Sequence, residues 1–156
     1  MMPISYIIRL KIMKIFNKRA KFDYKLEDER FEAGLSLSGG EAKAIRTGHL
    51  DLSGSVARIV GGEAWLINAN VPVLGSSKYD SKRSRKLLLH KNEIVSIGTK
   101  VKQQKLTLLP VAVYTKGRLV KAELALGKPK KKFEKRQEIK LRDIERDIAQ
   151  ELRVKK

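Results

Sequence analysis

A basic stretch at residues 82–97 contains side chains suited to binding a polyanion. If this stretch is a helix, Arg83, Lys86 and His90 fall at positions i, i+3 and i+7 and share one face. Such a face can follow nucleic-acid phosphates, with Leu89 and His90 able to touch a base or ribose. The spacing fits an ordinary amphipathic helix with a solvated basic face equally well, so both interpretations stay open.

The sequence contains no recognisable catalytic or metal-binding pattern. His49 and His90 are far apart and neither accompanies a nucleophile motif. There is no P-loop, no H-E-x-x-H and no glycine-rich dinucleotide turn, and the glycine pairs at 39–40 and 61–62 are better explained as turns. No histidine–carboxylate cluster has ligand spacing. We therefore predict a protein that is not an enzyme, with no metal, no cofactor and no small-molecule substrate.

The charge balance indicates the class of partner. The chain of 156 residues has 35 lysines and arginines and 17 aspartates and glutamates, giving a formal net charge of +18. This excess favours nucleic acid first and an anionic membrane second. No apolar run reaches the roughly 18 residues needed to cross a bilayer. The chain has no cysteine, which suits a reducing compartment, and we predict a cytoplasmic protein without a membrane span.

Much of the positive charge follows Gly127. Residues 128–156 open with closely spaced cations and Pro129, a composition that cannot order itself alone. Apolar residues then recur at helical spacing, as a narrow stripe: Leu141, Ile144, Ile148 and Leu152. We predict that this basic tail is disordered in the free protein and forms a helix on contact with its partner.

Alternating apolar and polar residues predict short strands before the tail. Residues 31–38 alternate with a period of two, which is typical of a half-buried strand. Residues 55–60 and 63–70 flank Gly61-Gly62 and predict a hairpin whose turn needs positive φ.

A second hairpin is predicted from residues 106–115 and 118–126, which flank Lys116-Gly117. Pro110 lies inside the first of these strands and indicates an edge or a bulge.

Two short helices are expected between the strands. Ser38 and Glu41 have the spacing of a capping box that opens a helix at residues 40–47, and Gly48 can close it. The second helix is predicted over residues 82–97. We therefore predict a mainly β fold, a small closed antiparallel barrel resembling an OB-fold, with two or three short flanking helices.

The predicted organisation has three parts: an N-terminal extension at 1–16, an RNA-binding barrel at 17–127, and the basic tail at 128–156. The extension mixes apolar residues with cations, and Arg9 interrupts any signal-peptide pattern. It is either an amphipathic extension or the product of an upstream start codon, with Met13 as the natural first residue. We favour the second interpretation.

Seven short segments in order resemble one family: NKRAKFDY, FEAGLSLSGGEAKAIRTG, GEAWLINANV, RSRKLLLHKNEI, LTLLPVAVY, VKAELALGK and KKFEKRQEIKLRD. From about residue 17 to 142 the chain resembles the SmpB, or SsrA-binding protein, family. Departures occur at Gly40, where the family has a bulkier residue, at residues 54–56, near Ser81, and at Phe133-Glu134, where the family usually has His-Asp.

The resemblance implies an OB-like barrel that binds the tRNA-like domain of transfer-messenger RNA and brings it to stalled ribosomes in trans-translation. It also implies that the tail folds as a helix in the empty messenger channel, near the decoding centre. Glu41 corresponds to an RNA-contacting glutamate in the family, although as a capping-box residue it can have a purely structural role.

The site residues follow from this resemblance and from the basic patterns. The predicted RNA-binding residues are Asn17, Lys18, Arg19, Glu41, Lys43, Arg46, Arg83, Lys86, Leu89 and His90. The predicted ribosome-binding residues of the tail are Lys130, Lys131, Lys132, Phe133, Glu134, Lys135, Arg136, Lys140 and Arg142.

Two alternatives share the same composition. A basic ribosomal or ribosome-assembly protein that binds ribosomal RNA permanently would have the same charge, barrel and tail. A membrane-surface protein that uses residues 1–12 would bind anionic vesicles instead.

Overall fold

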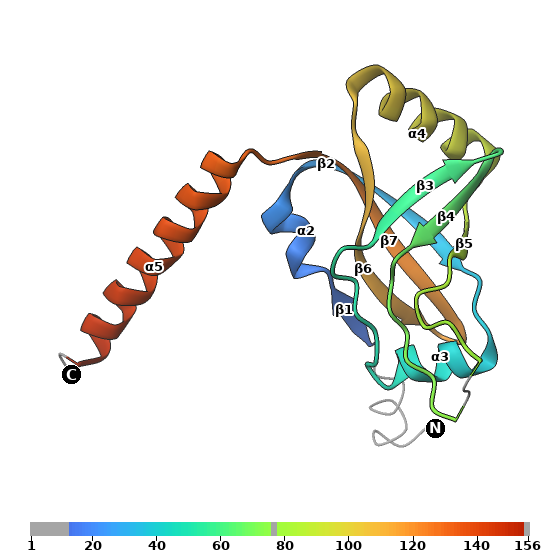
Figure 1. Ribbon diagram of the computed structural model, residues 1–156, viewed down its shortest axis with the longest axis horizontal. Coiled ribbons are helices and arrows are strands. Elements are labelled where there is room, and N and C mark those ends of the chain that lie inside the picture. Colours follow the sequence, from blue (N-terminus) through green and yellow to red (C-terminus); the bar gives the residue numbers. More distant parts are fainter. Residues whose placement is uncertain (1–12, 76–77, 155–156) are drawn as a thin grey trace, which may run out of the picture.

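The computed structural model describes residues 13–75 and 78–154 (Figure 1). In this part of the chain, seven antiparallel strands form one sheet. The strands are β1 (Lys14–Phe16), β2 (Tyr24–Leu35), β3 (Val56–Val60), β4 (Glu63–Ile67), β5 (Arg85–Leu88), β6 (Thr107–Lys116) and β7 (Leu119–Pro129). The helices are α2 (Lys18–Asp23), α3 (Gly39–Arg46), α4 (Lys91–Gln104) and α5 (Lys132–Val154).

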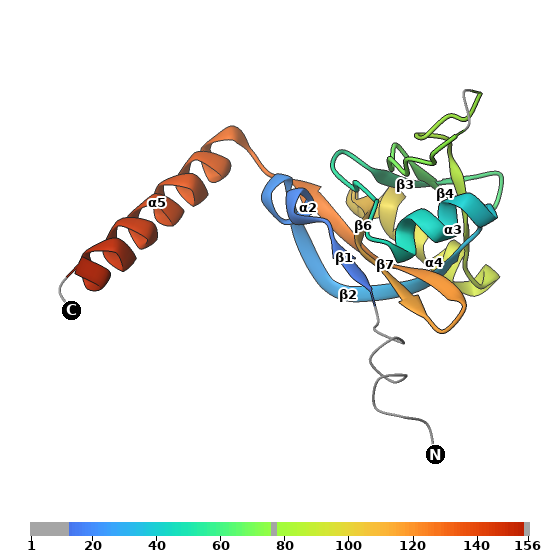
Figure 2. The same cartoon turned by 90° about the horizontal axis from the view of Figure 1, so that it is seen from below.

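The strand pairings close the sheet into a barrel. The order β6-β3-β4-β5-β2-β7 returns to β6 through the β6–β7 pairing. Strands β1 and β3 pair with different parts of β6. Lys14 of β1 pairs with Tyr114, whereas Ala57 of β3 pairs with Leu108. Three short helices lie around the barrel and α5 points away from it (Figures 1 and 2). The predicted fold class is therefore confirmed.

The core fills the barrel through period-two alternation. On β2, Phe31, Ala33 and Leu35 are buried and belong to one core cluster with side chains of the other strands. Ile45 of α3 and Ile97 of α4 join the same cluster with no exposed surface. Figure 1 shows these two helices at opposite ends of the barrel, so each closes one end of the core.

The hairpins depend on glycine at positive φ. Gly61 and Gly62 have φ of 60° and 76°, as the predicted turn between β3 and β4 requires. In the second hairpin Lys116 pairs with Leu119, so the turn is Gly117-Arg118, one residue later than predicted. The register of β6 against β7 shifts between Pro110 and Ala112, which confirms the predicted irregularity at this proline.

The helix predicted over residues 82–97 is wrong. Residues 85–88 form β5, which pairs with β4 and β2, and α4 begins only at Lys91. Arg83, Lys86 and His90 therefore do not form a helical stripe. His90 is the residue before the helix, and its backbone N–H donates to the Glu93 carboxylate at 3.4 Å, as in a capping box.

The predicted part boundaries also shift. Residues 14–16 pair within the sheet, and β7 continues to Pro129, so the barrel spans 14–129. The two interpretations of the N-terminal extension concern residues 1–12, which lie outside the described residues. Residues 132–154 form one helix. The disorder of this segment in the free protein stays a prediction.

Candidate nucleic-acid interface

Glu41 is the centre of a polar group that comprises the buried Glu41 and Arg85 and the partly buried Tyr79 and Arg83, hereafter the Glu41 cluster. Its carboxylate has no exposed surface. The capping box is present, because the Ser38 N–H donates to Glu41 Oε1 at 2.9 Å. The Tyr79 hydroxyl donates to Oε2 at 2.8 Å, and Arg83 Nε donates to the same oxygen at 3.1 Å. Arg83 Nη2 also donates to Oε1.

Arg85 makes the cluster possible. Its side chain is fully buried on β5, and its Nε donates to Glu41 Oε2 at 2.5 Å. The two terminal nitrogens donate to the carbonyls of Ala69, Arg83 and Ser81 and to the Tyr79 hydroxyl, at 2.8–3.0 Å. All five N–H groups of this guanidinium therefore have partners, which is the condition for burying an arginine.

The cluster keeps Glu41 ionised. Burial alone would raise the pKa of Glu41, but hydrogen bonds from Arg83, the Ser38 backbone, Tyr79 and Arg85 outweigh it and lower the pKa to about 2. The hydrogen bond to the carboxylate contributes, after burial, to a raised pKa of Tyr79. Because both carboxylate oxygens are occupied inside the protein, Glu41 positions Arg83 and the loop before β5. It presents no free oxygen to RNA.

The cluster leaves part of Arg83 accessible. The Arg83 side chain is 40% exposed while Arg85 beside it is completely covered. Lys86, the next residue on β5, is paired with Glu63 of β4 at 3.1 Å. Arg83 therefore lies on the loop before β5 and Lys86 lies on β5 itself. Of these two predicted residues, Arg83 contacts Glu41.

Asn17, which was predicted to bind RNA together with Lys18 and Arg19, has a structural role in the fold. It is almost fully buried, and its side chain accepts from the Ala20 N–H at 3.2 Å as the N-cap of α2. Its amide also donates to the Pro110 carbonyl at 2.9 Å. Asn17 therefore attaches the start of α2 to β6. Lys18 and Arg19, which follow it on α2, are exposed.

The other predicted RNA-binding residues lie on separate elements. Lys43 and Arg46 are exposed on α3, and Arg46 donates to the Arg118 carbonyl at 2.6 Å. His90 is exposed and Leu89 is partly buried between β5 and α4. Figure 1 places α2 on a different side of the barrel from β5 and α3, so the predicted set divides between two surfaces.

The predicted tail residues fall on α5 and just before it. Lys131, Lys132, Phe133, Glu134, Arg136, Lys140 and Arg142 are exposed, whereas Lys130 and Lys135 are partly covered. Phe133 is 68% exposed at the start of α5. The four apolar residues of the stripe are also exposed, and no residue of this helix is buried.

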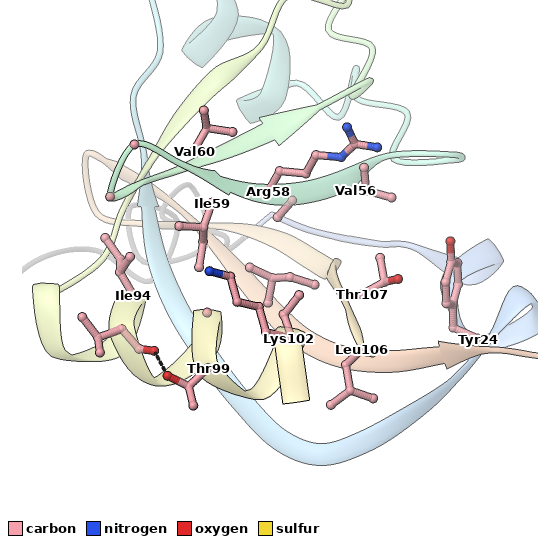
Figure 3. A pocket seen from close by; sticks show the side chains of 17 residues that line it. Tyr24, Val56, Arg58, Ile59, Val60, Ile94, Thr99, Lys102, Leu106 and Thr107 are labelled. Atoms are coloured by element: carbon pink, nitrogen blue, oxygen red, sulfur yellow. Dashed lines mark hydrogen bonds between the residues drawn. The ribbon is translucent and has the colours of Figure 1, made fainter. Parts of the chain in front are cut away.

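A groove of about 830 Å³ lies between β3 and α4 (Figure 3). Most of its lining is aliphatic, including Ile59 and Ile94, and Arg58 and Lys102 contribute cations from the two elements. None of the predicted RNA-binding residues lines it.

Sequence reasoning missed Tyr79 and Arg85. The spacing Arg83, Arg85, Leu87 would place all three on one face of a strand, and a carboxylate partner would then be needed for an arginine on the buried face.

The glycine at position 40, a departure from the family pattern, has little space for a side chain, because a Cβ there would lie 3.0 Å from Val73 Cγ1. The bulkier residue expected from the family would require Val73 to move.

Among the described residues, no helix is long and apolar enough to span a membrane. In the same ranges, no group of three or more histidines and carboxylates could hold a metal ion.

The closed barrel, the exposed cations around it and the basic terminal helix define a small OB-like β-barrel protein with a helical tail. The chain belongs to the SmpB family, because the model described as "SmpB protein" matches residues 14–154, which include the barrel and α5.

Proteins named SsrA-binding protein are similar over most of their length. The one from Chloroflexus aggregans is 43% identical over 141 residues, covering 88% of this chain and 89% of the relative. That of Carboxydothermus hydrogenoformans is 42% identical over 142 residues, covering 89% and 95%. A solved structure described as "tmRNA-SmpB: a journey to the center of the bacterial ribosome" aligns with a TM-score of 0.63 and 40% identity. It covers 77% of this chain and 86% of that one.

Proposed function

We propose that this protein is an RNA-binding adaptor that binds the tRNA-like domain of transfer-messenger RNA and delivers it to stalled ribosomes for trans-translation. The observation that carries the proposal is that the family match includes both the barrel and the tail helix, since it runs from β1 through α5. Its relatives are named for binding SsrA, and the aligned structure is a tmRNA–SmpB complex on the bacterial ribosome.

The physical properties of the chain support this activity. A net charge of +18 favours binding to RNA phosphates, with release of counterions as a driving force. The exposed cations of α2, α3 and the β5 region supply contacts for the tRNA-like domain. The Glu41 cluster holds Arg83 in place among them. The protein acts as a binding component, without chemistry of its own, in the cytoplasm where ribosomes translate.

The tail has a separate task in the proposal. Its cations meet ribosomal RNA along the messenger channel, and its apolar stripe gives the helix one face to pack there. The tail, residues 128–156, is disordered in the free protein in this proposal and orders as a helix in the channel, at an entropic cost met on binding. Phe133 stacks on an exposed base near the decoding centre.

Truncation separates the two tasks. A chain that ends after Lys131 keeps β7 complete and removes α5. We expect it to bind the isolated tRNA-like RNA as the full chain does, measured by gel shift, while tagging of peptides on stalled ribosomes is lost. Equal loss of both activities would contradict the division of labour.

The RNA that co-purifies with the full chain provides a second test. An adaptor is substoichiometric on ribosomes and enriched with one small structured RNA. Stoichiometric retention on the large or small subunit would instead indicate a permanent ribosomal component.

A further inference from the structure

The groove between β3 and α4 borders a strand edge that is left open. On one side, β3 pairs with β4 over its whole length, Val56–Val60. On the other side, a single pair, Ala57 with Leu108, joins it to β6. Within the described residues, no strand pairs with this side of β3 beyond Ala57. The second half of β3 therefore has one free edge, and the groove lies alongside it (Figure 3).

The free edge presents the backbone of Ile59. Because Gly61-Gly62 is a two-residue turn, Val60 and Glu63 form a hydrogen-bonded pair, and such pairs alternate along an antiparallel ladder. Arg58 and Val60 therefore direct their N–H and C=O groups to β4, whereas Ile59 directs its groups to the groove. In the ranges that the structure describes, no hydrogen bond outside the β3–β4 ladder involves the Ile59 backbone. These groups are available to pair with an added strand.

The side chains along this edge alternate between two environments. Ile59 packs against the core beside the buried Ala57, and the groove next to it is lined by aliphatic residues such as Ile94 of α4 and Leu106. Figure 3 shows Ile59 pointing into the space between β3 and α4. Arg58 is exposed on the outer face of the strand. A strand paired with this edge therefore has every second side chain against aliphatic groups and the others beside Arg58.

The charges around the groove are not balanced. Its lining contains two cations, Arg58 and Lys102, and no aspartate or glutamate. Lys102 extends into the space between α4 and β3 (Figure 3). Among the described residues neither cation has an ion-pair partner, whereas Lys100 on the same helix pairs with Glu29. Acidic side chains on an occupant supply the missing counter-charges.

Two other occupants fit less well. A second copy of this chain, paired edge to edge, would bring Arg58 and Lys102 of both copies together, and each copy carries a net charge of +18. An RNA strand would meet a lining that is mostly aliphatic, with Tyr24 as its single aromatic ring. Val60 and Val95 in the same lining are 61% and 69% exposed, which favours an occupant with apolar side chains.

We propose that this groove binds an extended, acidic segment of a partner protein, which adds as a strand to the free edge of β3. Aliphatic residues of the segment lie against Ile59 and α4, and its acidic residues pair with Arg58 and Lys102. The proposal goes beyond the RNA-binding function and does not depend on it, because none of the predicted RNA-binding residues lines the groove.

Peptide selection against the full chain tests the proposal. Random linear peptides are displayed on phage and selected in moderate salt, and we expect enriched sequences that alternate aliphatic and acidic residues. A synthetic peptide with the enriched sequence is then titrated against the parent and its variants, at a temperature where all are folded. Arg58→Glu should weaken binding about tenfold or more, because it places like charges opposite each other. Arg58→Lys should keep most of the affinity.

A matched control separates the groove from general charge attraction. Lys116→Glu makes the same change of charge on an exposed residue of β6 that does not line the groove, so it should leave the affinity for the peptide at the parent level. Equal losses for Arg58→Glu and Lys116→Glu, or a selection that enriches no sequence, overturn the proposal.

The backbone pairing has its own test. Methylation of the peptide amides, one at a time, should abolish binding at every second position, because the N–H groups of a strand point alternately towards and away from its partner. A uniform effect along the peptide overturns strand addition. An oligouridine whose binding depends on Arg58 and not on Lys116 would show that the groove takes RNA instead. All these measurements use the chain without transfer-messenger RNA, so their failure is distinct from failure of the proposed function.

Discussion

Glu41 and Arg85 form an ion pair, 2.5 Å from Oε2 to Nε, in which neither side chain has any exposed surface. The pair joins the start of α3 to β5 through two residues that are 44 positions apart in the sequence. The same carboxylate completes the capping box and holds Arg83. A local helix signal and a long-range tertiary contact therefore depend on one side chain.

Removing Glu41 should destabilise the protein strongly. Glu41→Ala leaves the buried Arg85 without its counter-ion, and loss of one partner of a buried pair costs about 3–5 kcal/mol. We expect a correspondingly lower free energy of unfolding in urea. Glu63→Gln is the matched control, since Glu63 pairs with Lys86 on the surface and should cost under about 1 kcal/mol. A similar loss of unfolding free energy in both variants would show that the buried Glu41–Arg85 pair contributes no more to stability than the exposed Glu63–Lys86 pair.

Acid should remove this stabilisation in a defined pH range. Folding lowers the pKa of Glu41 from 4.5 to about 2, so the ionised carboxylate stabilises the folded state above pH 4.5. That contribution, about 3 kcal/mol for a shift of this size, is lost as pH falls from about 4.5 towards 2. Glu41→Gln should flatten the pH dependence of the urea midpoint in this range. An unchanged slope would contradict the lowered pKa.

Asn17 should behave as a stability residue. Asn17→Ala removes the cap of α2 and leaves the buried Pro110 carbonyl without its donor, which together should cost about 2 kcal/mol or more. Asn17→Ser keeps a cap and should recover part of the loss. Thermal melting measures both. If both variants lose RNA affinity at a temperature where they are fully folded, Asn17 contributes to RNA binding and not to stability alone.

Lys43 should contribute a salt-dependent phosphate contact. Its side chain is exposed on α3, and Lys43→Ala should reduce the slope of log affinity against log salt by about 0.9 for RNA with duplex character. Lys102→Ala, on α4 and outside the predicted interface, is the charge-matched control. Titrations with the tRNA-like RNA between low and moderate salt measure the slope. Equal slopes for the parent and Lys43→Ala would remove Lys43 from the interface.

Phe133 should matter for activity on the ribosome and hardly at all for stability. Its ring is 68% exposed at the start of α5, so Phe133→Ala should leave the melting temperature unchanged. Loss of stacking on a base should weaken the tail's interaction by about 1–3 kcal/mol, seen as reduced tagging. Phe133→Tyr keeps a stacking ring and should remain active. Full tagging by the alanine variant would argue against stacking.

The local features of the fold were predictable because their causes are local. The Gly61-Gly62 turn, the Ser38–Glu41 capping box and the irregularity at Pro110 each depend on residues within a few positions of one another. The alternation in β2 likewise reports directly on which face is buried. The family resemblance then supplied the partner, which no local pattern can specify.

The strand β5 was missed because its cause is not local. Arg85 on a buried strand position reads as a surface residue until Glu41 and Tyr79 are known to surround it. The nearby helix signals belong to His90 and Glu93, which start α4 after β5 has ended. The same holds for the candidate site. The exposed cations could be predicted from the sequence, whereas the Glu41 cluster that positions Arg83 depends on long-range contacts and could not.

The order of strand pairing has a consequence for how this chain is made. Lys14 of β1 pairs with Tyr114, and Tyr24 at the start of β2 pairs with Pro129. During synthesis, the earliest strands must wait with open edges until nearly the whole barrel has left the exit tunnel. Non-local pairing of this kind slows folding and exposes strands to aggregation. We expect mutual repulsion among the chain's many cations to keep neighbouring nascent copies apart during that delay.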